Sequence, residues 1–255
     1  MKVGIRGRFN NRNRDWAIYA EIKALPPLFV RADGRNFKRL LSADFEKPYD
    51  ERFARGMVEA ATVFFEKSGF DPKLAYTFSD EINLFFTHLP FNGRIEKLDS
   101  VIAGFLASAL AIALGFKEPI AFDARVIPVC GEEEILGYLA QRQAEAWRNH
   151  LNAYGFYGLR AEGLSEEDAE QYLKGMRAMD VHEMLFRRGI NLNGTPAWQR
   201  RGILIAKERY EKEGYDPQAG TKVMVTRSRV VQLWDLPLFA SEDGRNLIAS
   251  LIETS

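Results

Sequence analysis

The sequence predicts an α+β protein with a ferredoxin-like βαββαβ core at about residues 25–130. Short apolar runs predict four strands, and two longer runs carry apolar residues at helical spacing. In chain order the predicted elements are a strand at 25–33, a helix at about 50–68, strands at 74–78 and 82–86, a helix at 94–115 and a strand at 122–129. This order is typical of the split βαβ arrangement.

The boundaries of these elements follow from local signals. The first strand is introduced by prolines and ends at Asp33 and Gly34, a dipeptide that is typical of turns. Asp50 can cap the helix that follows it. The strands at 74–78 and 82–86 are joined by three polar residues, so they predict a hairpin.

Residues 131–255 predict helical and hairpin additions to the same domain, so that 1–255 form a single domain. The expected elements are helices at 132–149, 164–175 and 179–187, and strands at 202–210 and 221–234 around a turn at 214–220. Ser165 is the expected N-cap of the second of these helices, in a start that resembles a capping box with Asp168.

Composition is that of an ordinary globular protein. The 255 residues are 46% hydrophobic and 27% charged, and 35 basic residues balance 35 acidic ones. This balance argues against a dominant polyanion-binding surface but not against a local one. Cys130 is the single cysteine, which suits a reducing cytoplasm. The apolar run at 101–116 predicts a buried helix rather than a membrane span.

Carboxylates are the strongest candidates for chemistry. Asp33 ends the first strand, and Asp80 and Glu81 lie in the predicted hairpin. Because the first and third strands are neighbours in a ferredoxin-like sheet, these groups are expected to meet. Carboxylates at such a place suit Mg²⁺, and a pair of these ions can activate an attacking oxygen and stabilise a leaving one.

Each of these features also has a simpler explanation, because such residues usually form turns and solvated hairpins. The combination is more informative. Gly34 lets the backbone approach a ligand, and Ser79 can donate to a phosphate. Arg35, Lys38 and Lys47 can offset phosphate charge, although Lys47 equally suits a surface position.

Two further charged sites keep two interpretations each. Glu81 either orients water or a metal ligand, or is a surface charge at a strand edge. Arg125 either holds phosphate or forms an edge ion pair.

Several blocks of this sequence closely resemble the tRNA-His guanylyltransferase family. They are RADGRNFKRLL (31–41), FEKPYDERFARGM (45–57), TFSDEINLFF (77–86), FDARVIPV (122–129), LAQRQAEAWRNHLNAYGFY (139–157) and INLNGTPAWQRRG (190–202). The resemblance runs in order over roughly residues 27–205. It is greatest to the bacterial and archaeal guanylyltransferase-like 3′–5′ polymerases.

The resemblance implies a polymerase-like palm and a nucleotidyltransferase that adds nucleotides in the 3′–5′ direction at the 5′ end of tRNA. It implies that ATP or GTP first activates the 5′ end. Asp33 and Asp80 would bind two Mg²⁺ ions with help from the carbonyl of Gly34, and Glu81 would join them in catalysis. The implied nucleotide-binding residues are Asp33, Gly34, Arg35, Asn36, Phe37, Lys38, Lys47, Ser79 and Asp80.

A polar and aromatic run near the end of the helix at 132–149 predicts an RNA face, since guanidinium, amide and indole groups suit RNA contact and base stacking. Together with a second basic patch, its residues are Arg142, Trp147, Arg148, Asn149, His150, Arg200 and Arg201. A third candidate is the basic arm at 6–14. The alternative is that Trp147 is core and the arginines form a solvated face.

The chain departs from the family at one motif. Eukaryotic members carry H-I-N-N-L-Y-N where this chain reads W-R-N-H-L-N-A (147–153). This difference favours template-directed repair of truncated tRNA 5′ ends over fixed guanylate addition to tRNA-His. A palm-fold nucleotide cyclase and a tRNA-binding module without catalysis are the alternatives. By analogy we expect a homo-tetramer built as a dimer of dimers. We expect no membrane among its partners.

Overall fold

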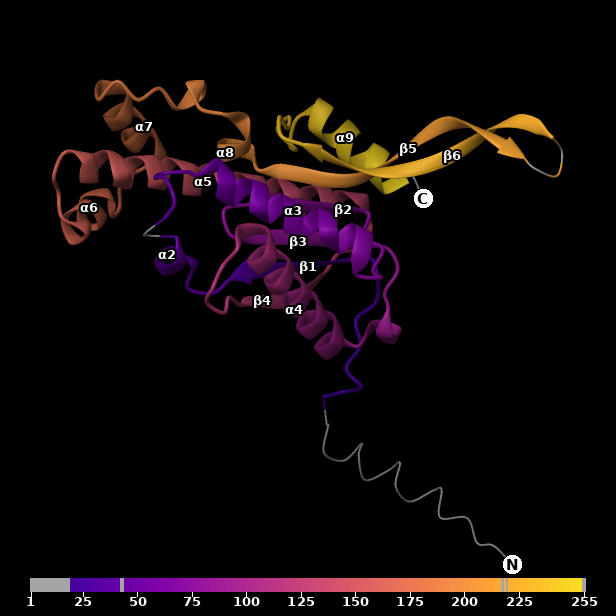
Figure 1. Ribbon diagram of the computed structural model, residues 1–255. Coiled ribbons are helices and arrows are strands. Elements are labelled where there is room, and N and C mark those ends of the chain that lie inside the picture. Colours follow the sequence, from indigo (N-terminus) through magenta and orange to yellow (C-terminus); the bar gives the residue numbers. More distant parts are fainter. Residues whose placement is uncertain (1–18, 42–43, 217, 219, 254–255) are drawn as a thin grey trace, which may run out of the picture.

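The computed structural model describes residues 19–41, 44–216, 218 and 220–253. The predicted basic arm at 6–14 lies outside these residues. A six-stranded antiparallel sheet forms the centre of the fold, in the order β4-β1-β3-β2-β5-β6 (Figure 1). Its strands are β1 (Leu28–Gly34), β2 (Leu74–Phe78), β3 (Glu81–Phe86), β4 (Phe122–Pro128), β5 (Ile203–Asp216) and β6 (Thr221–Leu233).

The first four strands confirm the predicted ferredoxin-like core. β1 pairs with both β3 and β4, and β3 pairs with β2. The pairing places Asp33 directly opposite Glu81 on one side and opposite Asp123 on the other. The ends of β1 and of the β2–β3 hairpin therefore lie side by side.

Two long helices cover one face of the sheet, α3 (Glu51–Lys67) and α4 (Ile95–Leu114). Alternate residues of β1 point toward them, namely Leu28, Val30 and Ala32, all fully buried. The predicted cap of α3 is confirmed, because the Asp50 side chain accepts a hydrogen bond from the Arg52 backbone N–H at 2.7 Å.

By length and composition α4 is the one helix among the described residues that could cross a membrane. It lies on the sheet through Leu98, Ile102, Leu106 and Leu110, all fully buried. Only 28% of its apolar 18-residue stretch is buried, and Ile112 on its outer side is exposed. The prediction of a buried helix therefore holds for one side of α4.

The opposite face of the sheet is covered by α5 (Gly131–Ala161) and by α9 (Glu242–Glu253), which was not predicted. Phe29, Tyr76 and Phe85 point to this side, where they pack with Leu139 and Phe239. The same face carries the polar side chains of the site, because residues at a spacing of two share a face.

α5 is much longer than the predicted helix at 132–149. It continues through Gly155, where an added Cβ would lie 3.1 Å from Leu173 and 3.2 Å from Val181. Glycine weakens an isolated helix, but here it allows the next helices to pack closely, and tertiary packing outweighs propensity.

The second half of α5 packs with the short helices that follow it. Together they form a helical module with a small hydrophobic core of its own. The other short elements are α2 (Phe37–Leu40), η1 (Phe91–Gly93), α6 (Glu166–Leu173), α7 (Ala178–Arg187), η2 (Leu192–Gly194) and α8 (Ala197–Arg201). Ser165 caps α6 as predicted, accepting a hydrogen bond from the Asp168 backbone N–H at 3.0 Å.

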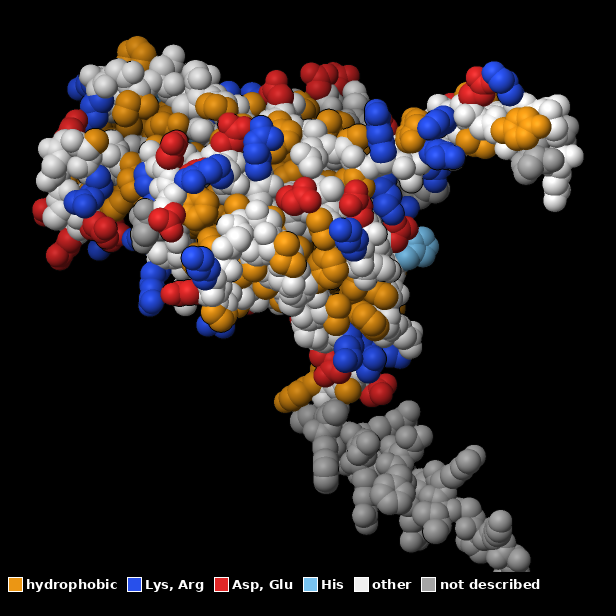
Figure 2. All heavy atoms as spheres, in the orientation of Figure 1, with side chains coloured by type: hydrophobic (Ala, Val, Ile, Leu, Met, Phe, Trp, Pro, Cys, Tyr) orange, Lys and Arg blue, Asp and Glu red, His pale blue; other side chains and the backbone are white. Residues whose placement is uncertain are grey.

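β5 and β6 form a hairpin that is longer than predicted and projects from the body as an arm (Figure 1). Ion pairs join its two strands, at 2.6 Å between Glu208 and Arg229 and at 2.5 Å between Glu213 and Lys222. Basic side chains lie along the base of the arm (Figure 2). Tyr215 and Met224 on its two strands are exposed.

Candidate active site

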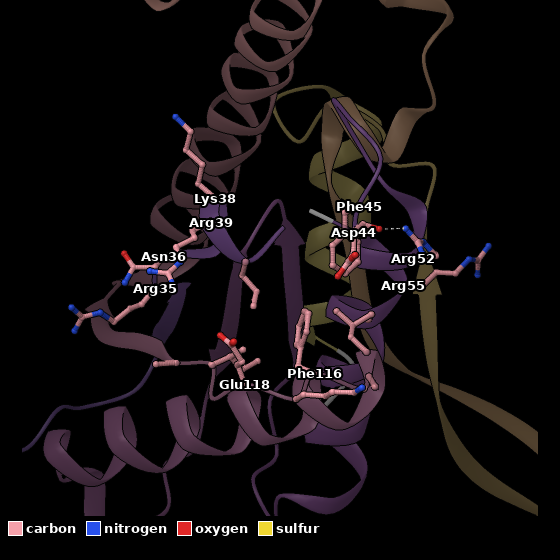
Figure 3. Close-up of a pocket in the computed structure, with 18 of the residues that line it drawn as sticks. Arg35, Asn36, Lys38, Arg39, Asp44, Phe45, Arg52, Arg55, Phe116 and Glu118 are labelled. Carbon is pink, nitrogen blue, oxygen red and sulfur yellow. Dashed lines mark hydrogen bonds between the residues drawn. The ribbon is translucent and has the colours of Figure 1, made fainter. Parts of the chain in front are cut away.

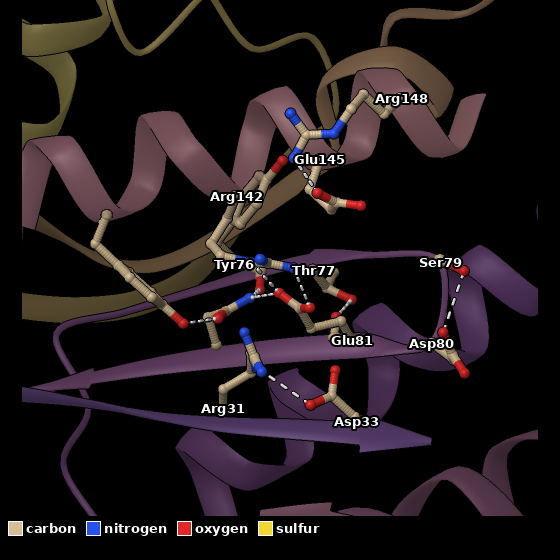
Figure 4. Close-up of polar contacts among 12 residues, drawn as sticks. Arg31, Asp33, Tyr76, Thr77, Ser79, Asp80, Glu81, Arg142, Glu145 and Arg148 are labelled. Carbon is tan, nitrogen blue, oxygen red and sulfur yellow. Dashed lines mark hydrogen bonds and ion pairs between the residues drawn. The ribbon is translucent and has the colours of Figure 1, made fainter. Parts of the chain in front are cut away.

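The candidate site lies where β1 ends beside the turn that joins β2 to β3 (Figure 4). The Gly34 backbone N–H donates to the Asp80 carbonyl at 3.0 Å, which fastens the end of β1 to this turn. The structure thus brings Asp33 and Asp80 together, as the predicted strand order requires.

Ser79 and Asp80 form the two-residue turn of the hairpin. Ser79 has a φ of 50°, in the left-handed region that non-glycine residues seldom adopt. Its hydroxyl donates to the Asp80 carboxylate at 3.2 Å and is exposed. A strained polar turn beside two carboxylates is typical of functional sites.

Positive charge surrounds Asp33. Its carboxylate lies 3.1 Å from the Arg31 guanidinium and 3.2 Å from that of Arg125. Arg125 also pairs with Asp123 at 2.6 Å, so the predicted edge ion pair is present. Arg125 remains half-exposed beside the site, where it can also meet a phosphate.

Asp80 carries a raised pKa. Burial is the main cause, because desolvation disfavours the charged carboxylate, and the negative charge of Asp33 raises the pKa further. A bound cation would relieve this disfavoured negative charge on Asp80.

These groups fit Mg²⁺ by the chemistry of their donors. Among the described residues, no cluster of three or more His, Cys, Asp or Glu side chains forms a ready-made metal cage. Two carboxylates with a nearby backbone carbonyl are the partial oxygen set that Mg²⁺ uses when water and substrate phosphates complete its shell. Asp33, Asp80 and the Gly34 carbonyl would be its protein ligands.

Glu81 lies inside a buried polar network rather than facing the open site (Figure 4). Its carboxylate accepts two hydrogen bonds from Arg142, at 2.8 and 2.5 Å, and one from Asn83 at 2.7 Å. Asn83 in turn accepts a hydrogen bond from Tyr138 at 2.6 Å. Glu81, the residue next to Asp80, is therefore held by buried hydrogen bonds, and the expectation of a surface charge at a strand edge is wrong.

Phe37 and Gly34 have structural roles that the sequence did not reveal. The Phe37 ring is buried against Phe53 and Phe122, so its side chain cannot contact a nucleotide. A Cβ on Gly34 would lie 2.7 Å from this ring. Gly34 is thus required for the packing of Phe37, in addition to any approach by a ligand.

The other predicted nucleotide-binding side chains are exposed around the site. Arg35 and Asn36 precede α2, and Asn36 is left-handed with a φ of 59°. Lys38 pairs with Glu170 of α6 at 3.2 Å. The Lys47 ammonium lies 5.9 Å from the Tyr157 ring, and burial lowers its pKa.

A pocket of about 250 Å³ opens beside Ser79. Its walls come from the loop at 45–50, the start of α3, the end of β2, the middle of α5 and α8. Its polar and aromatic lining residues include Lys47, Tyr49, Ser79, Asn149, Trp198 and Gln199. A partly open pocket with a mostly apolar lining and a few polar groups, next to paired carboxylates, is suited to a ligand.

A larger open cleft of about 1970 Å³ lies between α2, α3 and the end of α4 (Figure 3). Its labelled lining residues are Arg35, Asn36, Lys38, Arg39, Asp44, Phe45, Arg52, Arg55, Phe116 and Glu118. Arg52 is bound to Asp50 at 2.6 Å and Arg55 to Glu51 at 2.5 Å. The smaller pocket is the better candidate for a nucleotide site, because Ser79 lines it and does not line the cleft.

The predicted RNA face is divided by the structure. His150 is fully buried and Arg142 is held by Glu81, so direct RNA contact by these two side chains is wrong for this conformation. Arg148 and Asn149 are exposed, as an RNA face requires. Trp147 is half-buried and stacks on His150, with ring centroids 5.6 Å apart.

Arg200 and Arg201 are half-buried on α8. An Arg201 nitrogen donates to the Leu236 carbonyl at 2.7 Å, so this side chain supports the fold. Arg200 Nε is buried without a hydrogen-bond partner in the described structure.

Sequence reasoning missed Asn83, Tyr138 and Tyr154, and it assigned Gln199 only to the second basic patch. Each makes a side-chain hydrogen bond to a residue at least 45 positions away or belongs to such a chain of bonds. The alternation along β3, which places Asn83 on the same face as Glu81, is the one local signal that was available.

The fold and site define a palm-like α+β protein, with paired carboxylates at the end of β1 and in the β2–β3 turn. The chain belongs to the tRNA-His guanylyltransferase family. The model of tRNAHis guanylyltransferase matches residues 12–130, and the model of the family's C-terminal domain matches residues 133–233. It is therefore a nucleotidyltransferase by family, which does not favour the cyclase alternative.

Curated relatives carry the same name. The chain is 33% identical to a probable tRNA(His) guanylyltransferase of Drosophila melanogaster, over 71% of this chain and 67% of the relative. It is 28% identical to the tRNA(His) guanylyltransferase of Schizosaccharomyces pombe, over 83% of this chain and 85% of that one.

Solved structures show the same fold. A bacterial tRNA(His) guanylyltransferase-like protein in complex with GTP superposes with a TM-score of 0.72 at 24% identity, covering 96% of this chain and 98% of the other. The enzyme from Saccharomyces cerevisiae superposes with a TM-score of 0.66 at 26% identity, covering 75% of this chain and 91% of the other.

Proposed function

We propose that this protein is a tRNA 5′-end nucleotidyltransferase that adds nucleotides in the 3′–5′ direction. The placement of Asp33 beside Asp80 and Ser79 carries the proposal. It brings two carboxylates together with a hydroxyl that can donate a hydrogen bond to phosphate, beside the pocket that Ser79 lines. The relatives named tRNA(His) guanylyltransferase support tRNA as the substrate.

In this proposal the chain's own residues bind and orient the reactants. Asp33, Asp80 and the Gly34 carbonyl hold two Mg²⁺ ions, which supply charge neutralisation on the phosphates and activation of the attacking oxygen. Ser79, Arg35 and exposed Lys47 meet the triphosphate. The complexes of structural neighbours with GTP and with ATP support both nucleotides as substrates.

The reaction has two steps. The 5′-phosphate of the tRNA first attacks the α-phosphorus of ATP or GTP and displaces pyrophosphate, so that the end acquires a nucleoside monophosphate as its leaving group. The 3′-hydroxyl of an incoming nucleotide then attacks the activated phosphorus and the leaving group departs. Positioning and charge stabilisation provide most of the catalysis of such transfers.

We further propose templated repair of truncated 5′ ends as the main activity, with guanylate addition to tRNA-His as the second possibility. The motif at 147–153 supports this order, because Trp147 packs into the helical module and cannot copy the contacts of a histidine there.

The test is incorporation of labelled nucleotide into a 5′-truncated tRNA, with and without Mg²⁺. Asp33→Asn and Asp80→Asn should each reduce incorporation by at least a thousandfold, whereas Asp71→Asn should retain it. Asp71 is the matched control because it is an exposed carboxylate paired with Lys207 away from the site. Full activity in either site variant would refute the assignment.

A second arm separates the two activities. Substrates that differ in the base opposite the missing position should each receive the complementary nucleotide. Guanylate addition regardless of the opposing base would show fixed guanylylation instead.

We also propose a cytoplasmic homo-tetramer of single-domain subunits. Support for the tetramer comes from the family resemblance, and support for the compartment comes from the single exposed Cys130. Light scattering of the purified protein measures the oligomer, and a mass of one or two chains would refute the tetramer.

A further inference from the structure

The pocket beside Ser79 is lined by two side-chain amides, Asn149 on α5 and Gln199 on α8. Two other polar groups of the lining already have partners. The Asp50 carboxylate is bound by Arg52 and by the Glu46 backbone N–H, and the Thr77 hydroxyl donates to a carbonyl. Each amide carries both donors and an acceptor, so the two amides are suited to read the edge of a base.

Gln199 is held in one orientation. The Tyr154 hydroxyl donates to Gln199 Oε1 at 2.8 Å. Burial raises the pKa of Tyr154, so the phenol keeps its proton at neutral pH. With its oxygen occupied, Gln199 presents its NH₂ group as a hydrogen-bond donor.

Tyr154 is itself fixed by a cluster of aromatic rings. Its ring centroid lies 4.7 Å from that of His150 and 6.0 Å from that of Tyr49, which is stacked on it. Tyr49 also contacts Trp198 edge to face, at 5.9 Å. Tyr49 and Trp198 both line the pocket, so a planar base has aromatic surface to pack against.

Asn149 differs from Gln199 in its freedom. It is exposed, and no side-chain hydrogen bond to another described residue holds it. An amide that can turn presents its oxygen to a donor or its NH₂ group to an acceptor, so Asn149 cannot discriminate between bases.

We propose that Gln199, oriented by Tyr154, is a specificity-determining residue that selects guanine over adenine in this pocket. Guanine presents the O6 acceptor where adenine presents the N6 amino donor. A fixed NH₂ donor bonds to the first and opposes the second. The inference rests on the proposed function, because it requires that the pocket receives the base of the activating nucleotide, which no template base selects.

The first test uses base analogues on the wild-type protein, with binding measured by calorimetry. Inosine triphosphate keeps O6 and lacks the 2-amino group, so it should bind within about threefold of GTP. The triphosphate of 2-aminopurine riboside lacks O6, so it should bind about tenfold more weakly, as for one lost hydrogen bond. The reverse order would show that O6 is not read and would overturn the proposal.

The second test changes the residue. Gln199→Leu should weaken the binding of GTP about tenfold and keep the affinity for ATP within about threefold of wild type. Gln199→Glu places acceptors where the NH₂ group was, so its preference should turn toward ATP. An equal loss of affinity for both nucleotides, or no loss of affinity for GTP, would refute selection by Gln199.

Tyr154→Phe tests the orientation without touching the base. Gln199 can then turn, so the ratio of GTP to ATP affinity should fall while ATP affinity rises or stays equal. A purely structural role of Tyr154 would lower both affinities together. Asn149→Ala is the matched control, and it should leave the ratio unchanged.

A further variant separates failure of this inference from failure of the proposed function. Ala153→Phe fills the pocket from α5, where Ala153 lines it. It should weaken GTP and ATP but not inorganic tripolyphosphate, with thermal unfolding as the check on folding. Wild-type protein that binds no nucleoside triphosphate would refute the proposed function. Binding that Ala153→Phe leaves unchanged would refute this pocket alone.

Discussion

Arg142 and Glu81 form a two-point ion pair between α5 and β3, with hydrogen bonds of 2.8 and 2.5 Å and both side chains largely buried. Burial raises the pKa of Glu81, and the Arg142 guanidinium opposes that shift. The pair ties the helix that carries the exposed RNA-face residues to the strand that follows Asp80. It therefore positions the β2–β3 turn.

Removing one partner of this pair should be costly. Arg142→Met leaves a buried unpaired carboxylate, so we expect a loss of about 3 kcal/mol in the free energy of unfolding. Adding Glu81→Gln should restore much of it. Denaturant unfolding measures both. Arg148→Met, which removes the exposed pair with Glu145 on the same helix, should change stability by less than about 0.5 kcal/mol. Additive effects of Arg142→Met and Glu81→Gln would contradict the coupling.

Gly34→Ala should disturb the site through the core. The added Cβ would lie 2.7 Å from the Phe37 ring, so Phe37 and α2 must shift, at a cost of about 1–3 kcal/mol. Gly104→Ala on α4 is the control. Its Cβ would meet nothing within 4 Å, so we expect a gain of about 0.5–1 kcal/mol from helix propensity. Thermal unfolding distinguishes the two, and a neutral Gly34→Ala would contradict the packing argument.

Because of Asp99, the free energy of unfolding should fall as pH rises. Its Oδ1 atom is buried without a partner in the described structure, and burial raises its pKa from 3.8 to about 6. The folded protein holds a proton that the unfolded chain releases between these values, so stability is lost from about pH 4 to 6. Asp99→Asn should therefore be more stable than wild type at pH 8, by about 1 kcal/mol because the group is half-exposed. The gain should vanish below pH 4, and a gain that is equal at both pH values would exclude titration as its cause.

His150 should have the opposite pH dependence. Burial lowers its pKa from 6.5 to about 4, and the charge of Arg200 adds to the effect. Between these values the unfolded chain binds a proton that the folded protein does not, so stability falls as pH drops below 6.5. From pH 7.5 to 5 wild type should lose about 1–2 kcal/mol more than His150→Phe. Unfolding at both pH values measures this, and the exposed His88→Asn is the control that should follow wild type. Parallel pH dependence of wild type and His150→Phe would contradict it.

Local patterns in the sequence were enough to predict the core of the sheet. Strand periodicity, the cap at Asp50 and the order of elements are short-range signals, and together they predicted that Asp33 and Asp80 would meet. The family motifs then indicated the class of reaction. The length of α5, the α9 helix and the extended arm were missed, because their stability depends on contacts with distant segments.

Residue patterns and family motifs were enough to identify a palm-like member of a nucleotidyltransferase family with two carboxylates at one end of its sheet. The role of each neighbouring polar residue became clear from the tertiary contacts. In the folded protein His150 is buried and Phe37 lies in the core. Arg142 is paired with Glu81, and Tyr154 donates a hydrogen bond to Gln199. The reason is physical: the role of a polar side chain depends on which distant groups share its low-dielectric surroundings, and residue spacing does not contain that information.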